Sequence, residues 1–486
     1  MSTTIPTNEP ALDLAATASG SRWLPDYRTV WRWHFYAGLL TLPFVIILSI
    51  SGGIYLFKPQ IEAWNDRAYD SLDTERIAPV SDQVKAALDA FPGSTPNGYE
   101  LRRTDRSAAR VLIRKDDETL RVYVHPEKLT VLGSVQENQR IMKSIFKLHG
   151  ELWMGDRGSN LVELASSWTI IMIVTGLYLW WPRHQRLFGG VLFPRFGGGS
   201  RIFWRDLHSV TGVWISVFVL FLLVTGLPWA KFWGNYLKTI RNITGTAVAQ
   251  QDWTTGSERS ARGGRPAESG QGKGDAPRSN EHGDHGGGGR GSRRGGGSMP
   301  KDMEGFNRVF QSVQPLGLEY PVVIAPPSRG SENWTAKSTT QNRPNRVDLE
   351  LNGSTGEIVS RKDFKDKHWV DQVVGTCIAA HEGQLFGWPN QLLGLLTAMG
   401  LILVSVSGAI MWWRRRHRGV LGAPPIPPNP EVSILLSLLA VLFGIYLPLF
   451  GASLVLVLVI EWLILRRIPG LREWLGLQGG KTRAAA

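Results

Sequence analysis

Cysteine is nearly missing from this chain of 486 residues, because Cys377 is the only one. A single cysteine excludes a disulfide framework, a cysteine-bound iron–sulfur cluster and covalent haem attachment through a CxxCH motif within the chain. Cys377 itself is expected to be a small structural residue near the start of a helix.

The common catalytic motifs are missing as well. No G-x-G-x-x-G lies between a predicted strand and a predicted helix, which argues against a built-in nicotinamide or flavin site. No HExxH, G-x-S-x-G or paired-carboxylate motif is found either. The sequence therefore predicts neither hydrolysis nor an internal nucleotide-dependent redox site.

What the chain does contain is a set of long apolar runs, each above the roughly 18 residues that indicate a membrane-spanning helix. The net charge of +13 belongs to this pattern and does not indicate nucleic-acid binding. Short, basic loops between spans are typical of the cytoplasmic side. The arginines that define these loops are Arg183, Arg186, Arg195, Arg201 and Arg205, and then Arg414, Arg415, Arg416 and Arg418.

Two histidines open apolar runs with the same spacing. His34 is followed by Gly38 and by the Ser-Gly pair that ends at Gly52. His208 is followed at the same distances by Gly212 and by the Thr-Gly pair that ends at Gly226. This repetition indicates a tandem duplication.

A second pair of histidines repeats in the same way. His149 stands 27 residues before Gly176, in TGLYLWWPR, and His381 stands 27 before Gly408, in SGAIMWWRRR. A histidine at a membrane boundary is thus retained in all four elements. An ionisable imidazole in or beside hydrocarbon is a hypothesis for a functional site.

The predicted fold is a polytopic α-helical membrane protein, with a four-helix core from the duplication, a C-terminal apolar segment and two external α+β domains. Its parts are a cytoplasmic tail (1–29), a first span (30–57), an external domain (58–142), an outer-face histidine segment with a second span (143–182), a cytoplasmic loop (183–206), a third span (207–230), a second external domain (231–375), an outer-face histidine segment with a fourth span (376–413), a cytoplasmic loop (414–431), a C-terminal membrane segment (432–465) and a tail (466–486).

Each external domain is expected to combine one helix with a few strands. The helices are SDQVKAALDAF and FNRVFQSVQPLG, and the strands include ARVLIRK and NRVDLELNGSTGEIVSR. Residues 254–300 are rich in Gly, Arg and Ser and predict a disordered loop. The run 432–465 is divided by Pro448 and Gly451, and the sequence leaves open whether it forms a tight hairpin, which the basic tail with Arg466, Arg467 and Arg472 slightly favours, or one long kinked span.

Depth in the membrane suggests how the four histidines pair. His34 and His208 are expected near the cytoplasmic face, and His149 and His381 near the outer face, as two bis-histidine centres. In a helical bundle the cofactor that such centres favour is haem, here b type since no CxxCH is present. The alternative is interfacial histidines beside helix-packing glycines.

The other histidines have simpler interpretations. His184 and His417, at the basic boundary, are expected to be interfacial, and they are the reserve candidates for the inner pair. His125 and His368 are expected to be structural. His282 and His285 lie in the predicted disordered loop, where a solvated linker is favoured over a metal-binding tract.

These motifs resemble the PepSY-associated transmembrane family over roughly residues 25–420. The resemblance rests on the segments LHGEL, HEGQL, TGLYLWWPR, SGAIMWWRR and WRDLHSVTG. It implies a bacterial inner-membrane protein with periplasmic PepSY-like domains, similar to di-haem reductases that act on ferric siderophores during iron uptake. The ligands that it implies are His34, His149, His208 and His381.

On this interpretation the protein is a haem-dependent transmembrane ferric reductase with two b-type haems. Its electron donor would be a quinol or a cytoplasmic reductase. Its acceptor would be a ferric siderophore, attracted by basic side chains of the first external domain: Arg102, Arg103, Arg106, Arg110 and Arg114. The alternatives are a cofactor-free PepSY protein that regulates a partner or peptidase, and a transporter component.

Overall fold

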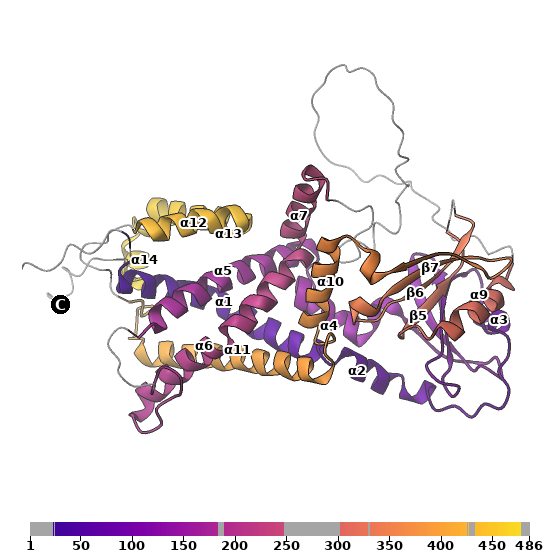
Figure 1. Ribbon diagram of the computed structural model, residues 1–486. Coiled ribbons are helices and arrows are strands. Elements are labelled where there is room, and N and C mark those ends of the chain that lie inside the picture. Colours follow the sequence, from indigo (N-terminus) through magenta and orange to yellow (C-terminus); the bar gives the residue numbers. More distant parts are fainter. Residues whose placement is uncertain are drawn as a thin grey trace, which may run out of the picture. The chain divides into compact units, whose positions relative to one another are not determined.

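The computed structural model in Figure 1 contains long apolar helices and one β-sheet. It describes residue 23 and residues 25–182, 189–246, 302–328, 331–424, 426 and 433–477. The predicted loop 254–300, with His282 and His285, and the reserve candidate His184 lie outside these residues. Within the described residues, five helices are long and apolar enough to cross a membrane: Tyr27–Tyr55, Asp156–Trp180, Gly199–Trp229, Trp388–Arg415 and Pro448–Leu465.

The chain divides into two compact units, and four of the long helices contribute residues to both. These helices are α1 (Tyr27–Tyr55), α5 (Asp156–Trp180), α6 (Gly199–Gly226) and α11 (Trp388–Arg415). Unit 1 consists of Met1–Pro43, Leu164–Trp214 and Val404–Ala486, and unit 2 of Phe44–Glu163 and Ile215–Leu403. Each unit is described by itself.

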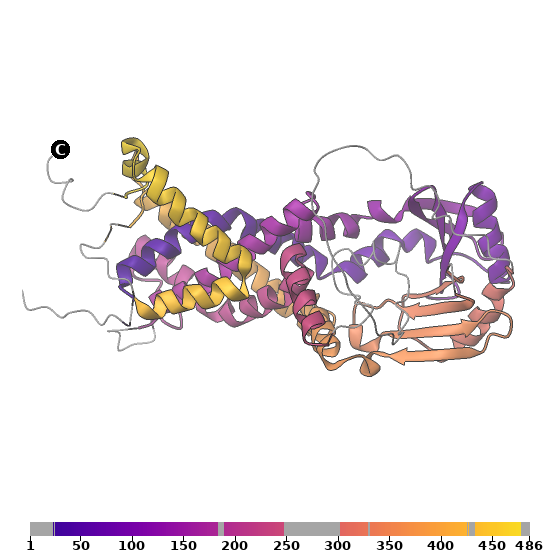
Figure 2. The same ribbon diagram turned by 90° about the horizontal axis from the view of Figure 1, so that it is seen from above.

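The C-terminal apolar run of unit 1 forms a helical hairpin, one of the two arrangements that the sequence left open for residues 432–465. Helix α12 (Ile434–Tyr446) and helix α13 (Pro448–Ile460) meet at Leu447. A Cβ at Gly451 would lie 2.9 Å from the Gly444 Cα. In a continuous helix, residues seven positions apart are separated by about 10.5 Å, so this contact requires the chain to turn between them. Figure 2 shows the two helices in yellow, diverging from this turn. A π-helical turn (Glu461–Leu465) and α14 (Pro469–Trp474) follow.

The two tryptophans of each Trp-Trp pair in unit 1 have different surroundings. Trp181 and Trp413 are exposed. Trp180 donates to the Val191 carbonyl at 3.0 Å, and Trp412 donates to the Leu421 carbonyl at 2.8 Å. The first tryptophan of each pair therefore anchors the loop that follows its helix.

Unit 2 contains a single antiparallel sheet of eight strands in the order β4-β3-β2-β1-β5-β6-β7-β8. The sequence treated the two external regions as two domains, but β1 pairs directly with β5 and joins them. The strands are β1 (Thr95–Glu100), β2 (Ala109–Lys115), β3 (Glu118–Val124), β4 (Val131–Gln136), β5 (Val322–Ala325), β6 (Asn333–Ser338), β7 (Val347–Asn352) and β8 (Ile358–Asp363).

Two helices, α3 (Val80–Ala90) and α9 (Gly305–Val313), cover one face of this sheet (Figure 1). The predicted apolar faces supply the core, because Val84 and Phe306 are fully buried between helix and strand. The remaining helices of unit 2 are α2 (Lys58–Asn65), α4 (Ile141–Glu151), α7 (Lys231–Ile243) and α10 (Trp369–His381).

Candidate functional site: two histidine pairs

The structure brings the four predicted histidines together in two pairs, one in each unit. In unit 1 the ring centroids of His34 on α1 and His208 on α6 are 6.3 Å apart, with ring planes at 86°. In unit 2 the centroids of His149 on α4 and His381 on α10 are 6.5 Å apart, at 74°. These are the two pairings expected from the sequence, and the role of the residues as ligands stays a prediction.

Each imidazole lies against a glycine of a neighbouring helix. A Cβ added at Gly52 would lie 2.9 Å from Cε1 of His149, and one at Gly176 would lie 3.1 Å from Cε1 of His34. The corresponding distances are 3.3 Å from Gly408 to His208 and 3.6 Å from Gly226 to His381. The repeated glycines thus let the rings approach the helix backbone.

The residue before each of these glycines is a serine or threonine whose hydroxyl meets Nδ1 of the histidine. The distances are 3.0 Å for Thr175 and His34, 3.3 Å for Ser407 and His208, 3.1 Å for Ser51 and His149, and 2.9 Å for Thr225 and His381. Sequence reasoning noted only a repeated small residue here. The signal that it missed is that all four small residues carry a hydroxyl.

These contacts fix the tautomer of the rings. The Thr175 hydroxyl donates its one proton to the Ile171 carbonyl at 2.8 Å, so towards His34 it can only accept. Nδ1 of His208 lies 2.9 Å from the Val404 carbonyl, which is also an acceptor. The hydrogen therefore resides on Nδ1 and the lone pair on Nε2. Histidines that ligate metals are commonly oriented in this way.

The pair of His149 and His381 lies in helices outside the candidate spans, and its electrostatics favour neutral rings. Desolvation, with a smaller contribution from His149, lowers the pKa of His381 to about 4. Desolvation also lowers the pKa of His149. Neutral imidazole is the form that binds a metal.

The ring spacing fits one metal ion held between two imidazoles. A metal–nitrogen bond to histidine is about 2.0–2.1 Å, and the ring centre lies roughly 1.2 Å beyond the nitrogen, so facing rings would have centroids about 6.4 Å apart. No group of three or more His, Cys, Asp or Glu that could hold a metal occurs in the described residues. Two protein ligands are too few for a bare ion such as zinc but suit a haem, whose macrocycle supplies the other four.

The glycines four residues after His34 and His208 are compatible with a flat macrocycle beside the helix. A Cβ at Gly212 would meet no protein atom within 4 Å, and one at Gly38 would meet only Met172, at 3.6 Å. Protein packing therefore does not require glycine at either position.

The other described histidines lie outside the pairs. His125 accepts from the amides of Glu127 and Lys128, both at 3.2 Å. His368 caps α10 by accepting from the Val370 amide. Both contacts are local and structural in kind. His417 is exposed after the end of α11.

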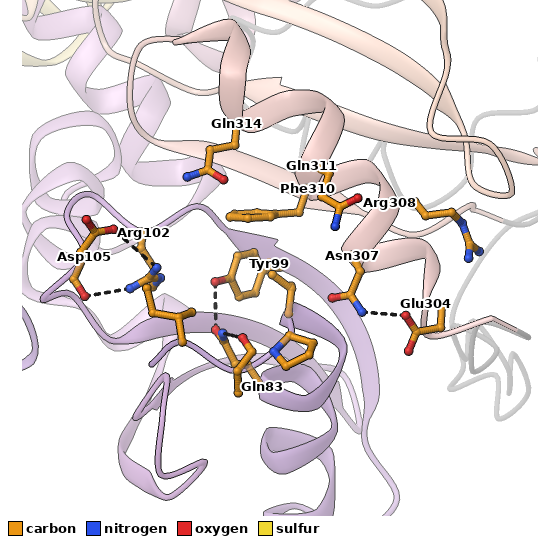
Figure 3. Close-up of a pocket in the computed structure, with 14 residues that line it drawn as sticks. Gln83, Tyr99, Arg102, Asp105, Glu304, Asn307, Arg308, Phe310, Gln311 and Gln314 are labelled. Carbon is orange, nitrogen blue, oxygen red and sulfur yellow. Dashed lines mark hydrogen bonds and ion pairs between the residues drawn. The ribbon is translucent and has the colours of Figure 1, made fainter. Parts of the chain in front are cut away.

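Unit 2 also has a hollow of about 500 Å³ beside α3 and α9 (Figure 3). Tyr99 forms part of its wall and donates to Gln83 at 3.0 Å. Among its charged residues, Arg102 lies 3.8 Å from Asp105. The lining carries both signs of charge, so it provides no obvious basic site for an anion.

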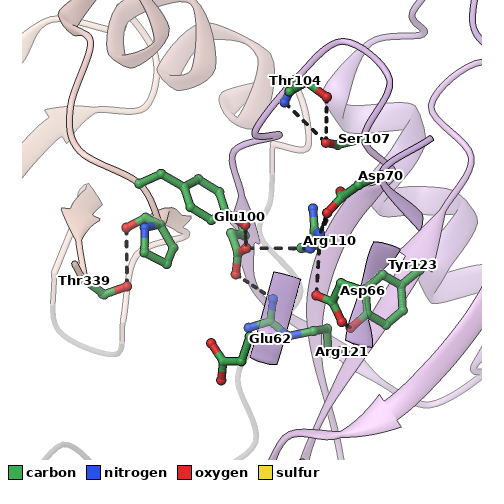
Figure 4. A network of polar contacts seen from close by, with 12 residues as sticks. Glu62, Asp66, Asp70, Glu100, Thr104, Ser107, Arg110, Arg121, Tyr123 and Thr339 are labelled. Carbon is green, nitrogen blue, oxygen red and sulfur yellow. Dashed lines mark hydrogen bonds and ion pairs between the residues drawn. The ribbon is translucent and has the colours of Figure 1, made fainter. Parts of the chain in front are cut away.

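Three of the basic residues expected to attract an anion pair with or stack on protein side chains, and only Arg110 among these three is buried. Arg110 is buried and meets Asp70 at 2.8 Å, in the network that Figure 4 shows. Arg106 pairs with Asp73, and Arg103 stacks on the Tyr320 ring. The expectation that these arginines attract an anion from solvent is wrong for Arg110, because its side chain is buried in this polar network.

Five long apolar helices with a β-sheet region define a multi-pass membrane protein. The chain belongs to the family described as the PepSY-associated TM region, whose model matches residues 31–415. Both histidine pairs lie within this range, and the hairpin of α12 and α13 follows it. No curated protein matches the sequence.

Proposed function

We propose that the protein is a di-haem oxidoreductase of the bacterial inner membrane. It passes electrons across the membrane to a ferric siderophore in the periplasm and releases iron as Fe(II). The observation that carries the proposal is the pair geometry: centroids at 6.3 and 6.5 Å, with each Nδ1 facing a hydroxyl. The ferric siderophore rests on the resemblance to di-haem reductases of this family.

Each histidine pair would bind one haem. His34 and His208 would hold one b-type haem, and His149 and His381 the other. Bound haem supplies one-electron chemistry, with a potential that depends on its ligands. With both histidines of a pair holding the iron, the group would supply electron transfer and not substrate binding. Reduction of one ferric ion takes one electron, drawn from a quinol or a cytoplasmic reductase.

Haem content tests the first part of the proposal. Purified full-length protein should contain two haems per chain by the pyridine haemochrome assay. His34→Ala or His208→Ala should remove one haem, and His149→Ala or His381→Ala the other. His417→Ala, at an exposed histidine, is the control. A wild-type protein without haem would exclude the proposal, and haem loss in the control would redirect the inner pairing.

Electron transfer tests the second part. In proteoliposomes with pre-reduced haem, ferric siderophores on the outer face should reoxidise the haem and yield Fe(II) that a ferrous chelator traps. Reoxidation by another periplasmic acceptor, but by no ferric chelate, would retain the oxidoreductase and exclude iron as the substrate.

A second candidate is a cofactor-free protein whose sheet binds a periplasmic partner. The hollow beside α3 and α9 favours it, since its mixed polar and apolar lining suits a peptide or small ligand. An absorbance spectrum with and without dithionite separates the two candidates, because only the first absorbs as haem.

A further inference from the structure

Arg415, the last residue of α11, is held inside unit 1 by aromatic rings. Its guanidinium carbon lies 4.9 Å from the centroid of the Trp31 ring and 5.3 Å from that of Phe35. One terminal nitrogen donates to the Gly422 carbonyl at 3.1 Å. Its Nε is buried and has no hydrogen-bond partner within the described part of the chain. A buried donor without an acceptor is unfavourable, so this position is suited to a group that can accept a hydrogen bond.

The adjacent arginines differ from Arg415. Arg414 is exposed and hydrogen-bonds to Ser200. Arg416 is also exposed and stacks on Trp413, with 4.6 Å between the guanidinium carbon and the ring centroid. Neither has a buried nitrogen without a partner among the described residues. The inward position is therefore particular to Arg415 within this basic run.

Arg415 lies beside the inner histidine pair. Trp31 and Phe35, which flank its guanidinium, stand three residues before and one after His34 on α1. On α11, Gly408 receives the ring of His208 and precedes Arg415 by seven residues. Seven residues are two helical turns, about 10.5 Å, on nearly the same face. Side chains on a helix lean towards its N-terminus, which here is towards Gly408.

We propose that Arg415 binds a propionate carboxylate of the haem that His34 and His208 would hold. The inference rests on the proposed function. Haem carries its carboxylates on one edge of the macrocycle, away from the iron, and a carboxylate inside a membrane protein needs a cationic partner. Guanidinium is suited to this role because it offers parallel N–H donors to both carboxylate oxygens.

The duplication supports this position. Arg183 follows Gly176 by the same seven residues that separate Arg415 from Gly408. Arg183 lies outside the described residues, so the inference concerns Arg415 alone.

The test compares haem with its dimethyl ester, in which both carboxylates are blocked. Full-length apo-protein from a haem-deficient host is loaded with either compound, and release to apomyoglobin is followed. The kinetic phase of release that is absent in His34→Ala belongs to the haem site of His34 and His208. Wild-type protein should release the ester on the order of tenfold faster than haem, as expected for loss of one charged hydrogen bond.

Three variants decide whether Arg415 causes this difference. Arg415→Gln and Arg415→Met should release both compounds at similar rates and should lower the midpoint potential of the inner haem, since a nearby cation favours the reduced state. Arg415→Lys should recover part of the discrimination. Arg416→Gln, which removes the same charge one residue away, should behave as wild type.

The remaining outcomes are also decisive. Wild-type discrimination in Arg415→Gln or Arg415→Met would overturn the inference. If both variants lose the inner haem, recovery in Arg415→Lys supports a charge-based role, and failure to recover assigns Arg415 to packing and overturns it. Absence of haem from the wild type would instead exclude the proposed function itself.

Discussion

The hydroxyl oxygen of Thr225 lies 2.9 Å from Nδ1 of His381, and its proton is directed to the Phe221 carbonyl 2.7 Å away. The threonine is therefore an acceptor for the imidazole N–H. Such a contact holds the ring in one orientation and makes its other nitrogen a stronger donor. A hydroxyl also meets Nδ1 at the other three histidines, although at His208 the Val404 carbonyl, 2.9 Å away, is the nearer acceptor.

If His149 and His381 hold a haem as proposed, replacing this hydroxyl should change that haem without removing it. In Thr225→Val the shape is retained and the hydroxyl acceptor is lost, while the hydrogen bond between the ring and the Leu222 backbone remains, so His381 becomes a weaker ligand. We expect about tenfold weaker haem retention and a higher midpoint potential, because a weaker donor stabilises the oxidised iron less. Redox titration and haem transfer measure both effects. Thr225→Ser keeps the hydroxyl and should resemble wild type, and an equal shift in both variants would contradict the role of the hydroxyl.

The glycine contacts predict selective loss of one haem. In Gly52→Ala the new Cβ would lie 2.9 Å from Cε1 of His149 and would displace the ring. The protein should then contain one haem per chain instead of two by the pyridine haemochrome assay. Gly53→Ala is the matched control, because its Cβ would meet Ala398 at an ordinary 3.8 Å. Two haems in the Gly52 variant would show that the ring tolerates this displacement.

The polar network that contains Arg121 and Glu137 predicts a loss of stability in acid. Burial alone would raise the pKa of Glu137, but the ion pair with Arg121, 2.9 Å away, together with Arg140 and Lys143 outweighs it and lowers the pKa overall. A lowered pKa means that the unfolded chain binds the proton first, so this contribution is present above the ordinary pKa and is lost as the pH falls below it. Glu137→Gln should flatten the fall in melting temperature between about pH 5 and about pH 3. An unchanged slope would contradict the role of this pair.

The histidine sites could be predicted largely because they repeat. Four histidines with matched glycine spacings identify the residues, and the structure pairs them as expected. The sequence could not show that Ser51, Thr175, Thr225 and Ser407 face Nδ1, since a hydroxyl before glycine is equally compatible with plain helix packing. Arg110 shows a different limit, because its burial depends on acidic residues about forty positions earlier in the chain.

The sheet shows where local pattern fails. Strands β2 and β7 alternate apolar and polar residues and were predicted, whereas β1 (Thr95–Glu100) was not, because Pro96 and Gly98 are typical of turns. In the structure the register shifts between these two residues, and β1 pairs with β5 across the junction of the two halves. The pairing that unites the sheet is thus made by the strand with the weakest sequence signal.

The close packing at Gly98 predicts that a substitution there weakens the pairing of β1 with β5. A Cβ there would lie 2.9 Å from Cγ1 of Val323 and 3.1 Å from the Ile324 carbonyl, so any side chain would push β5 away. Gly98→Val should destabilise unit 2 by about 1–3 kcal/mol, as overpacking usually does. Limited proteolysis should then cleave the sheet region faster, with haem content unchanged. Val359→Ala, on the exposed edge strand β8, is the control and should have little effect. Wild-type protease resistance in the Gly98 variant would mean that the two halves of the sheet do not depend on the close approach of β1 and β5.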